Sequence, residues 1–514
     1  MKRFFQKLTV FILIAALSLS VYPQNVFSLT AFSYSFESGQ TDGWSGSAIL
    51  QENVGSCTLQ TDTAKAYEGK QSLRIEYSGS TKYVITGPEP ETINPGDRIE
   101  YWIFIPKSSN LNRIYFYSID SEGNRDESWF HNDEGLVRGK WFNLSYRVDP
   151  EGNAPFSSYG FDLETEHGQS GSLWIDAIRI KSDEVKTCPT VPGLRKGVSY
   201  TTSLSTLKEG NNTLNQSNLD LIRNSGFDHI RLPIKLNDQS LETAPYTINE
   251  DYLELVDLAI AQALAKDLNV ILDLHNYPIL TEGTNKKLDE ERYFAFWTQL
   301  SNRYSQYSDN LYFQILDEPD WYIGSEKLNS ILQKSLSIIR ETNPTRNLIV
   351  PHTRWSGVRS VNMLELPEND RHLIVSIHFY EPIAFTHQGT DWIFDSLKSQ
   401  KGVPWSGTVK EKYAISDLFD LVADWAVTNN RPVILDEFGV YNLAPSDDRA
   451  IWTDFVRETA EERNISWTYW EFNAGFGVFA PWKGMFRLEV LDALIPDSID
   501  KTGTGFTIAS EITN

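Results

Sequence analysis

The chain has 514 residues, of which 40% are hydrophobic and 22% are charged, and these proportions are ordinary for a globular protein. This length allows two or three domains. The formal net charge of −23 argues against a nucleic-acid partner, because a protein that binds nucleic acid presents a basic face.

The N-terminus has the three-part pattern of a secretory signal peptide. Lys2 and Arg3 precede an apolar run from Leu8 to Leu19, and Val26-Phe27-Ser28 offers a cleavage site, so we assign residues 1–28 to the signal. The apolar run is too short to span a membrane comfortably, and no later segment reaches about 18 apolar residues. We therefore expect a secreted, extracellular protein with no membrane contact after the signal is removed.

The chain has two cysteines, Cys57 and Cys188. In an oxidising compartment they could form a disulfide between the first domain and the segment that follows it. Two free thiols are an equally acceptable interpretation, and the spacing of the cysteines supports no metal site.

Residues 31–184 predict an all-β sandwich. Short segments of alternating polarity are separated by Gly, Asn, Asp and Ser, as in antiparallel sandwiches, and no helical period is present. The clearest predicted strands are residues 72–77, 98–105, 112–117 and 173–180.

Three segments of this region resemble jelly-roll carbohydrate-binding modules. They are Phe36-Glu37-Ser38-Gly39 with Asp42-Gly43-Trp44, then Ala66-Tyr67-Glu68-Gly69-Lys70-Gln71-Ser72-Leu73, then Trp174-Ile175-Asp176. The resemblance implies that the first and last strands pair and that the Glu and Asp beside them can hold a structural calcium. Aromatic side chains that point outwards would stack on sugars, and the sequence leaves open which ones do. The candidates are Trp44, Tyr101, Tyr115, Tyr117 and Trp129.

Residues 185–194 predict a short, semi-rigid linker with Pro189, Pro192 and Gly193. From residue 195 to 505, apolar strands alternate with amphipathic helices, which predicts a (β/α)₈ TIM barrel. The predicted strands are residues 195–199, 229–232, 270–274, 311–316, 348–350, 373–377, 433–435 and 466–470. The predicted helices are residues 215–224, 251–266, 289–304, 326–341, 410–428 and 447–463.

Two of these strands end in paired acids. Leu316 is followed by Asp317-Glu318-Pro319, and Leu435 is followed by Asp436-Glu437. Pro319 favours extended backbone at Glu318 and ends the strand. Glu318 and Glu437 lie about three strand–helix units apart, which suits strands four and seven of a barrel whose chemistry lies at the C-terminal strand ends. Two facing carboxyl groups are the requirement for glycoside cleavage.

Other strand ends carry further polar and aromatic residues that should converge with this pair. Arg231 follows His229-Ile230, and His275 and Asn276 follow Asp273-Leu274. The remaining candidates are His378, Tyr380 and Trp470. Strand alternation should turn Asp436 and Glu471 away from the cleft.

Residues from about 195 to 500 resemble glycoside hydrolase family 5, a cellulase-type (β/α)₈ family of retaining enzymes. The family pattern places Arg on strand two, His-Asn after strand three, Asn-Glu-Pro after strand four, His-x-Tyr after strand six, Glu after strand seven and Trp after strand eight. Tyr380-Glu381-Pro382-Ile383-Ala384-Phe385-Thr386-His387-Gln388-Gly389 is also similar to a loop of endoglucanases in this family, which favours β-1,4-glucan over mannan.

The resemblance implies a role for each of these residues. Glu437 would be the nucleophile, oriented by Arg231 and Tyr380, and Glu318 would be the acid/base. Hydrogen bonds to the sugar would come from His275, Asn276, Asp317 and His378, with Trp470 stacking against its ring. No metal and no cofactor would be required.

Asp317 departs from the family pattern, which has Asn there. The family's Asn donates a hydrogen bond to the 2-hydroxyl of the sugar, whereas an ionised Asp can only accept one. A second carboxylate beside Glu318 should also raise the pKa of one of the two.

These observations predict a secreted, monomeric, retaining endo-β-1,4-glucanase acting on polysaccharide. One alternative keeps the mechanism and moves the substrate to mannan, xylan, xyloglucan or another β-glucan. The alternative from another class is a glycan-binding protein whose barrel is impaired by Asp317. The sequence leaves endo or exo action open.

Overall fold

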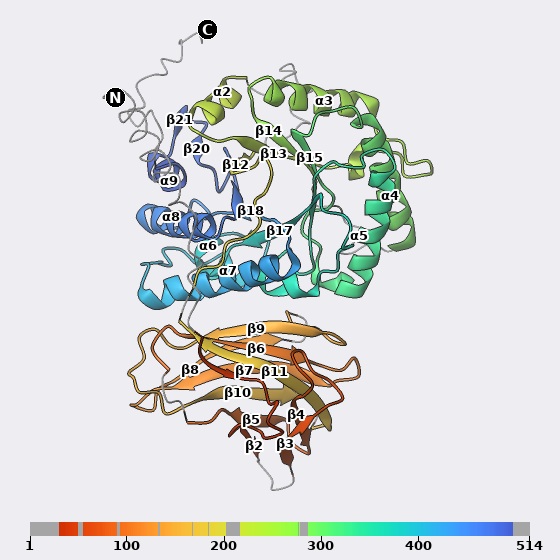
Figure 1. Cartoon of the computed structure of the whole chain (residues 1–514). Coiled ribbons are helices and arrows are strands. Elements are labelled where there is room, and N and C mark those ends of the chain that lie inside the picture. The colour runs from red at the N-terminus through yellow and green to blue at the C-terminus, as the bar shows by residue number, and fades with distance from the viewer. Residues whose placement is uncertain are drawn as a thin grey trace, which may run out of the picture.

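The computed structural model describes residues 30–49, 55–89, 93–131, 134–166, 168–182, 184–201, 216–275, 277 and 286–496. Figure 1 shows an antiparallel β-sandwich followed by a barrel of parallel strands ringed by helices. The predicted order of a sandwich and then a TIM barrel is therefore confirmed. The proposed signal peptide and Asn276 lie outside the described residues.

The sandwich consists of two antiparallel sheets. The first contains β3 (Ser56–Asp62), β4 (Ser72–Ser78), β11 (Gly171–Lys181), β6 (Arg98–Phe104) and β9 (Trp141–Arg147), with β1 (Thr30–Tyr34) paired to β11. The second contains β2 (Ser45–Ile49), β5 (Lys82–Thr86), β10 (Ser158–Thr165), β7 (Leu111–Ile119) and β8 (Arg125–His131). Alternating apolar side chains from both sheets form one core. The pairing of β1 with β11 is the pairing of first and last strands that the resemblance implied.

The acids proposed to hold calcium in the sandwich are bound by backbone N–H groups. Asp176 accepts hydrogen bonds from the backbone N–H groups of Tyr67, Glu68 and Ala177, and Glu37 accepts from those of Lys70 and Gln71. Calcium takes carboxylate and carbonyl oxygens as ligands, and a structural calcium beside these acids stays a prediction.

Both cysteines are free thiols. Cys57 lies in β3 of the sandwich, whereas Cys188 is buried beside the barrel, where its N–H donates to the carbonyl of Arg463. The structure therefore agrees with two free thiols and not with a disulfide between them.

The barrel is closed by eight parallel strands. They are β12 (Lys196–Ser199), β13 (His229–Ile234), β14 (Asn269–Leu274), β15 (Leu311–Gln314), β16 (Leu348–Val350), β17 (Leu373–Phe379), β18 (Val433–Phe438) and β19 (Ser466–Tyr469). The main outer helices are α2 (Gln216–Asn224), α3 (Glu250–Leu264), α4 (Lys286–Arg303), α5 (Ser325–Arg340), α7 (Val409–Asn429) and α8 (Ser446–Glu462), followed by α9 (Leu488–Leu494). Every predicted barrel strand and helix begins and ends within three residues of the observed one.

The segment between the domains packs against the barrel. Val191 and Leu194 are buried in one cluster with inward-pointing residues of the strands, among them Ile271 and Ile434. The hydroxyl of Tyr312 donates to the carbonyl of Pro192 over 2.6 Å. This segment therefore closes one end of the barrel in addition to linking the domains.

The two domains meet at α7, through a buried carboxylate. Asp420 accepts from Arg98 over 2.6 Å and from Arg147 over 2.9 Å, both on sandwich strands, and from Arg463 of the barrel over 2.7 Å. The next residue, Leu421, belongs to the sandwich core. Three guanidinium groups thus share one buried acid, which fixes the sandwich against the barrel.

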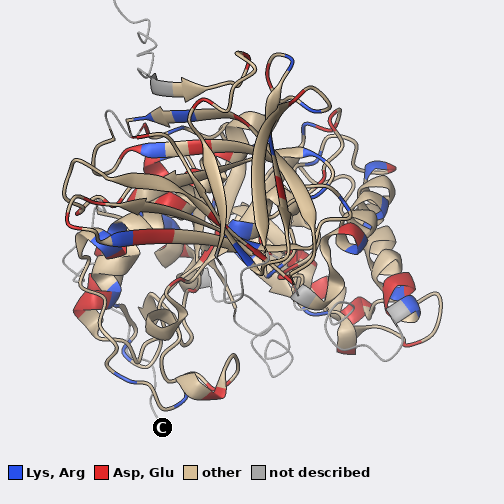
Figure 2. Cartoon of the chain, turned by 90° about the horizontal axis from the view of Figure 1, so that it is seen from below, with Lys and Arg blue, Asp and Glu red and all other residues tan. Residues whose placement is uncertain are grey.

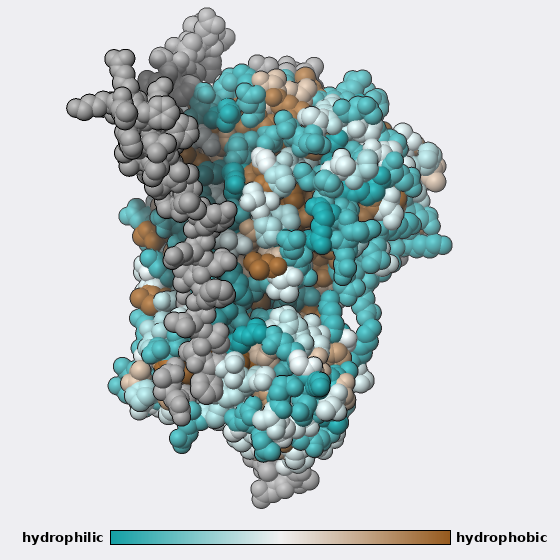
Figure 3. All heavy atoms as spheres, in the orientation of Figure 1, coloured by the Kyte–Doolittle hydropathy of each residue, from teal (hydrophilic) through white to brown (hydrophobic). Residues whose placement is uncertain are grey.

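Acidic and basic residues are mixed on the surface. Acidic and basic residues are interspersed on the side shown in Figure 2, and on the face in Figure 3 hydrophilic residues predominate, with hydrophobic ones scattered. None of the described helices is long and apolar enough to cross a membrane.

The domain contact gives a stability prediction. Asp420→Ala leaves three buried guanidinium groups without their shared carboxylate, so the free energy of unfolding should fall by about 3–5 kcal/mol. Urea denaturation followed by circular dichroism measures this change. Glu365→Ala is the control, because it removes an exposed Lys140–Glu365 pair (3.5 Å) across the same boundary and should cost less than about 1 kcal/mol. Equal, small losses in both variants would contradict the buried role of Asp420.

Candidate active site

The C-terminal ends of the strands bring the predicted site residues together. Arg231 comes from β13, His275 follows β14, and Asp317 and Glu318 follow β15. On the other side of the opening lie His378 at the end of β17, Tyr380 just after it, Glu437 in β18 and Trp470 after β19. Asn276 falls outside the described residues.

Arg231 is fully buried at the centre of this group. Its Nη1 donates to Oε1 of Glu437 over 2.5 Å, its Nη2 to Oδ1 of Asp317 over 2.7 Å, and its Nε to Oε1 of Gln314 over 2.7 Å. Nη2 also lies 3.0 Å from Oδ2 of Asp273. A guanidinium group with this many carboxylate partners holds the acids of three strands in fixed positions.

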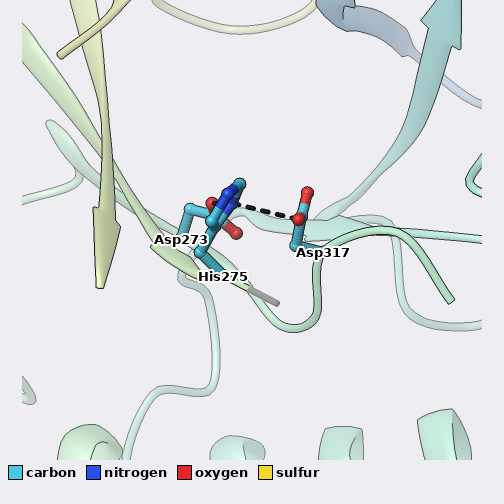
Figure 4. A group of neighbouring side chains, drawn as sticks. All are labelled: Asp273, His275 and Asp317. Atoms are coloured by element: carbon cyan, nitrogen blue, oxygen red, sulfur yellow. Dashed lines mark hydrogen bonds and ion pairs between the residues drawn. The ribbon is translucent and has the colours of Figure 1, made fainter. Parts of the chain in front are cut away.

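His275 lies between two aspartates, as Figure 4 shows. Its Nδ1 is 2.9 Å from Oδ2 of Asp273 and 3.0 Å from Oδ2 of Asp317. Burial alone would lower the pKa of His275, but the charges of Asp317 and Asp273 raise it to about 10. In the same way burial would raise the pKa of Asp317, but the charges of His275 and Arg231 hold it well below its usual range. The two residues form a buried ion pair at neutral pH.

His378 contacts both acids of the predicted catalytic pair. Its Nδ1 lies 2.8 Å from Oε1 of Glu318 and 3.6 Å from Oε2 of Glu437. Its Nε2 lies 3.3 Å from Oδ1 of Asp436, which also accepts from the hydroxyl of Ser376 over 2.7 Å. Asp436 is buried behind His378, which agrees with the expectation that it turns away from the cleft, and it supports the His378 ring from that side.

The pKa of Glu437 is raised in this cluster. Burial and the carboxylates of Asp317 and Glu318 raise it, the charges of His378 and Arg231 oppose the rise, and the resulting pKa is about 7. The hydroxyl of Tyr380 donates to its Oε2 over 2.9 Å. A raised pKa was expected for Asp317 or its neighbour, but the pKa of Asp317 is lowered, because His275 and Arg231 stabilise its charge.

The backbone at Glu318 differs from the extended conformation that Pro319 was expected to impose. Glu318 has a φ of +34°, in the left-handed region that few non-glycine residues occupy. Such strained positions cluster at functional sites, where the surroundings hold a side chain in a direction the relaxed backbone would not give. The expectation of extended geometry was wrong.

Aromatic rings line the opening. Trp470 is half-buried and stacks on His275, with ring centroids 5.4 Å apart. Several exposed aromatic residues on loops that follow the barrel strands were not predicted; they are Tyr322, Trp355, Trp392, Phe394 and Trp482. Flat apolar rings beside polar groups are suited to sugars, which present C–H-rich faces.

The loop after Tyr380 positions that residue. Thr386 donates its hydroxyl to the carbonyl of Tyr380 over 2.5 Å, and the ring of His387 packs edge-on against the Tyr380 ring at 4.8 Å. Burial lowers the pKa of His387 to about 4, so this histidine stays neutral. The loop singled out in the sequence therefore supports the hydroxyl that reaches Glu437.

Among the residues that the structure describes, two groups are close enough to share a metal ion. One is Asp273, His275 and Asp317, and the other is Asp317, His378 and Glu437. The guanidinium of Arg231 already contacts Asp273, Asp317 and Glu437 and supplies the positive charge that a metal would bring.

Sequence reasoning missed Asp273, Gln314 and Asp436 as partners in the site. Asp273 could have been found, because strand alternation puts it on the same face as His275 two residues later. Gln314 lies in a strand that reads as a buried apolar run, and Asp436 precedes Glu437 on the same strand, so neither gave a local signal.

The barrel matches known proteins, and the family model for cellulase, glycosyl hydrolase family 5, covers residues 194–475. Endoglucanase H of Acetivibrio thermocellus is 31% identical over 258 residues, which is 50% of this chain and 27% of that protein. The chain thus spans about a quarter of that relative's length.

Solved structures show the same similarity. Clostridial cellulose synthase subunit Z from Clostridioides difficile is 33% identical with a TM-score of 0.55, covering 59% of this chain and 99% of that one. Thermotoga maritima Cel5A in complex with mannotriose is 30% identical, with a TM-score of 0.55 over 59% of this chain and 98% of that one. The same Thermotoga protein has also been solved with cellobiose.

The ion pair of His275 gives a pH prediction. In protein with ¹⁵N-labelled histidine, NMR should find both ring nitrogens of His275 protonated from about pH 5 to pH 9. Asp317→Asn removes the carboxylate that raises the pKa of His275 most, so this pKa should fall and a titration should enter the range. His352 is the internal control, because burial lowers its pKa to about 3 and it stays neutral throughout. A wild-type His275 that titrates near its ordinary value of about 6.5 would contradict the ion pair.

Proposed function

Because the chain belongs to glycosyl hydrolase family 5, we propose that it is an endoglucanase that hydrolyses β-1,4-glucan with retention of anomeric configuration. The observation that carries the proposal is the shared contact of Glu318 and Glu437 with Nδ1 of His378, at 2.8 and 3.6 Å. The two carboxylate oxygens can be no farther apart than these distances added together. The two carboxyl groups therefore approach each other beside one imidazole nitrogen, which favours the close pair of a retaining enzyme.

Glu437 acts as the nucleophile. Its carboxylate attacks the anomeric carbon while the bond to the leaving oxygen breaks and Glu318 gives that oxygen a proton. Glu318 then takes a proton from water, the water oxygen bonds to the anomeric carbon, and Glu437 is released. The donors on Glu437, from Arg231 and Tyr380, favour its ionised form.

Neighbouring carboxylates affect the protonation of Glu437. A pKa of about 7 for Glu437 belongs to a cluster in which Asp317, Glu318 and Glu437 repel one another. Reaction requires Glu437 ionised and the proton on Glu318. Substrate favours this form, because the glycosidic oxygen accepts a hydrogen bond from a protonated Glu318.

Asp317 changes how the sugar is held at the cleavage point. One of its oxygens accepts from Arg231 and the other lies 3.0 Å from Nδ1 of His275, so an ionised Asp317 offers only acceptor positions. The 2-hydroxyl of the sugar would donate to Asp317 instead of accepting. His275, Asn276 and His378 supply further hydrogen bonds, and Trp470 supplies the stacking surface.

The choice of glucan rests on the similar proteins, and mannan is the first substrate alternative. Thermotoga maritima Cel5A has been solved with both cellobiose and mannotriose, so the shared barrel is compatible with either sugar. Xylan, xyloglucan and other β-glucans complete the set to be tested.

A second candidate function is glycan binding without turnover. Asp317 is the observation in its favour, because a carboxylate replaces the amide donor of the family at the cleavage point. The positive φ of Glu318 and the raised pKa of Glu437 favour turnover, since strain and perturbed pKa values accompany catalytic groups.

The remaining proposals concern the whole protein. We propose that it is exported by residues 1–28, acts as a monomer, and carries a glycan-binding sandwich at 31–184, joined through 185–194 to a catalytic domain at 195–505. The two-carboxylate reaction itself needs no metal or organic cofactor.

The first test is reducing-sugar release from carboxymethylcellulose, barley β-glucan, mannan and xylan. The wild type should release sugar from a glucan, and Glu437→Gln should lower the rate by at least about 10³-fold, because the amide cannot act as nucleophile. If no polysaccharide is cleaved but an affinity gel retains the protein, the binding function is supported. The Asp317→Asn variant then distinguishes an impaired enzyme from a glycan-binding protein, since restored turnover would identify Asp317 as the cause of the lost activity.

A further inference from the structure

The outer face of the five-stranded sheet carries a row of polar and aromatic side chains. Trp129 of β8 pairs across the sheet with Tyr115 of β7, which pairs with Asp162 of β10. Arg113 donates to the hydroxyl of Tyr115 over 3.1 Å, and that hydroxyl donates to Glu164 over 3.1 Å. This row, Trp129–Tyr115–Asp162, presents both a ring and hydrogen-bonding groups to solvent.

Trp129 lies where this face meets the barrel. The guanidinium of Arg359, in the 3₁₀ helix η5 (Val358–Met363), lies 5.6 Å from the Trp129 ring centroid, and Arg113 lies 5.8 Å from it. A Cβ added to Gly135 would lie 2.6 Å from the carbonyl of Arg359, so sandwich and barrel backbones approach closely here. The two arginines hold the ring in place and leave 41% of Trp129 exposed.

The turn that precedes Arg359 is hydrogen-bonded to the segment that carries Glu318, the proposed acid/base. Four residues before Arg359, Trp355 donates its N–H to the carbonyl of Pro319 over 2.8 Å, next to Glu318. Arg354, Trp355 and Ser356 all have positive φ, at 61°, 55° and 55°, and this turn presents Trp355 with 45% of its surface exposed. Consecutive left-handed residues of this kind are rare and are held by their surroundings.

The charge of Arg359 also acts on the residue next to Tyr380, which contacts the proposed nucleophile. Glu381 directly follows Tyr380, the residue that donates to Glu437. The surrounding protein raises the pKa of Glu381, the charge of Arg359 lowers it, and the charge of Glu134 in the sandwich raises it. The charges of Arg359 and of Glu134 in the sandwich thus act on the residue that follows Tyr380.

We propose that the sandwich forms the outer end of the leaving-group side of the cleft, where Trp129 binds a distal sugar of the glucan chain being cleaved at Glu318. The inference rests on the proposed endoglucanase function. Glu318 protonates the leaving oxygen, so the leaving part of the chain lies beside Glu318. From there it passes over Trp355 to Trp129.

The chemistry of this surface fits a β-glucan. Trp355 and Trp129 offer stacking surfaces for sugar faces, and the charged side chains around them offer hydrogen bonds to hydroxyl groups. The buried ion network of Asp420 fixes the distance between the two rings, so both can engage one chain at little entropic cost.

The test compares a long and a short substrate. Trp129→Ala should lower kcat/KM on barley β-glucan about 3- to 10-fold more than on p-nitrophenyl cellobioside, whose leaving group is a single ring that ends near Glu318. Tyr67→Ala is the matched control, because Tyr67 is an aromatic residue, 38% exposed, in the loop between β3 and β4, where it stacks on Trp102 of the other sheet. For this variant the ratio of kcat/KM on the two substrates should equal that of the wild type.

Equal losses on both substrates, or none on either, would overturn the role of Trp129. If the wild type cleaves neither substrate, the endoglucanase proposal fails instead. Electrophoresis through a gel containing β-glucan then tests glucan binding by Trp129 independently of catalysis. Weaker retardation of Trp129→Ala would support the site, and retardation equal to that of the wild type would overturn it.

Discussion

The buried guanidinium of Arg231 is the interaction on which the rest of the site depends. Acids on strands β14, β15 and β18 would repel one another in a buried space, and a single always-charged residue contacts one acid from each. Because the same group donates to Glu437 and to Asp317, it fixes where the nucleophile points and keeps Asp317 ionised. The protonated rings of His275 and His378 complete the balance of charge.

The aspartate that replaces the family's asparagine is therefore accommodated electrostatically. It brings a negative charge into the site, and His275 holds the matching positive charge at 3.0 Å. The consequence falls on Glu437, whose pKa is raised in part by this neighbour. The position beside the two glutamates therefore carries a negative charge and can only accept hydrogen bonds.

The alternation of strands and helices made the barrel predictable, since each strand is an apolar run bounded by turns and each helix has a clear apolar face. The strand ends likewise located Arg231, Glu318 and Glu437, because parallel strands direct their C-terminal residues to one opening. The backbone of Glu318, the role of Asp436 behind His378, and the contact of Trp129 with Arg359 depend on tertiary packing between distant segments. No local pattern encodes them. The backbone N–H groups that donate to Glu37 and Asp176 likewise come from a loop whose shape depends on tertiary packing.

The stereochemistry of hydrolysis reports directly whether the two glutamates act by double displacement. Proton NMR recorded immediately after enzyme is added to a soluble β-1,4-linked oligosaccharide resolves the anomer formed first, before mutarotation. Double displacement through Glu437 predicts the β-anomer, because two successive inversions at the anomeric carbon retain its configuration. The α-anomer as first product would contradict it, because a single displacement by water would then be the reaction and Glu437 could not be the nucleophile.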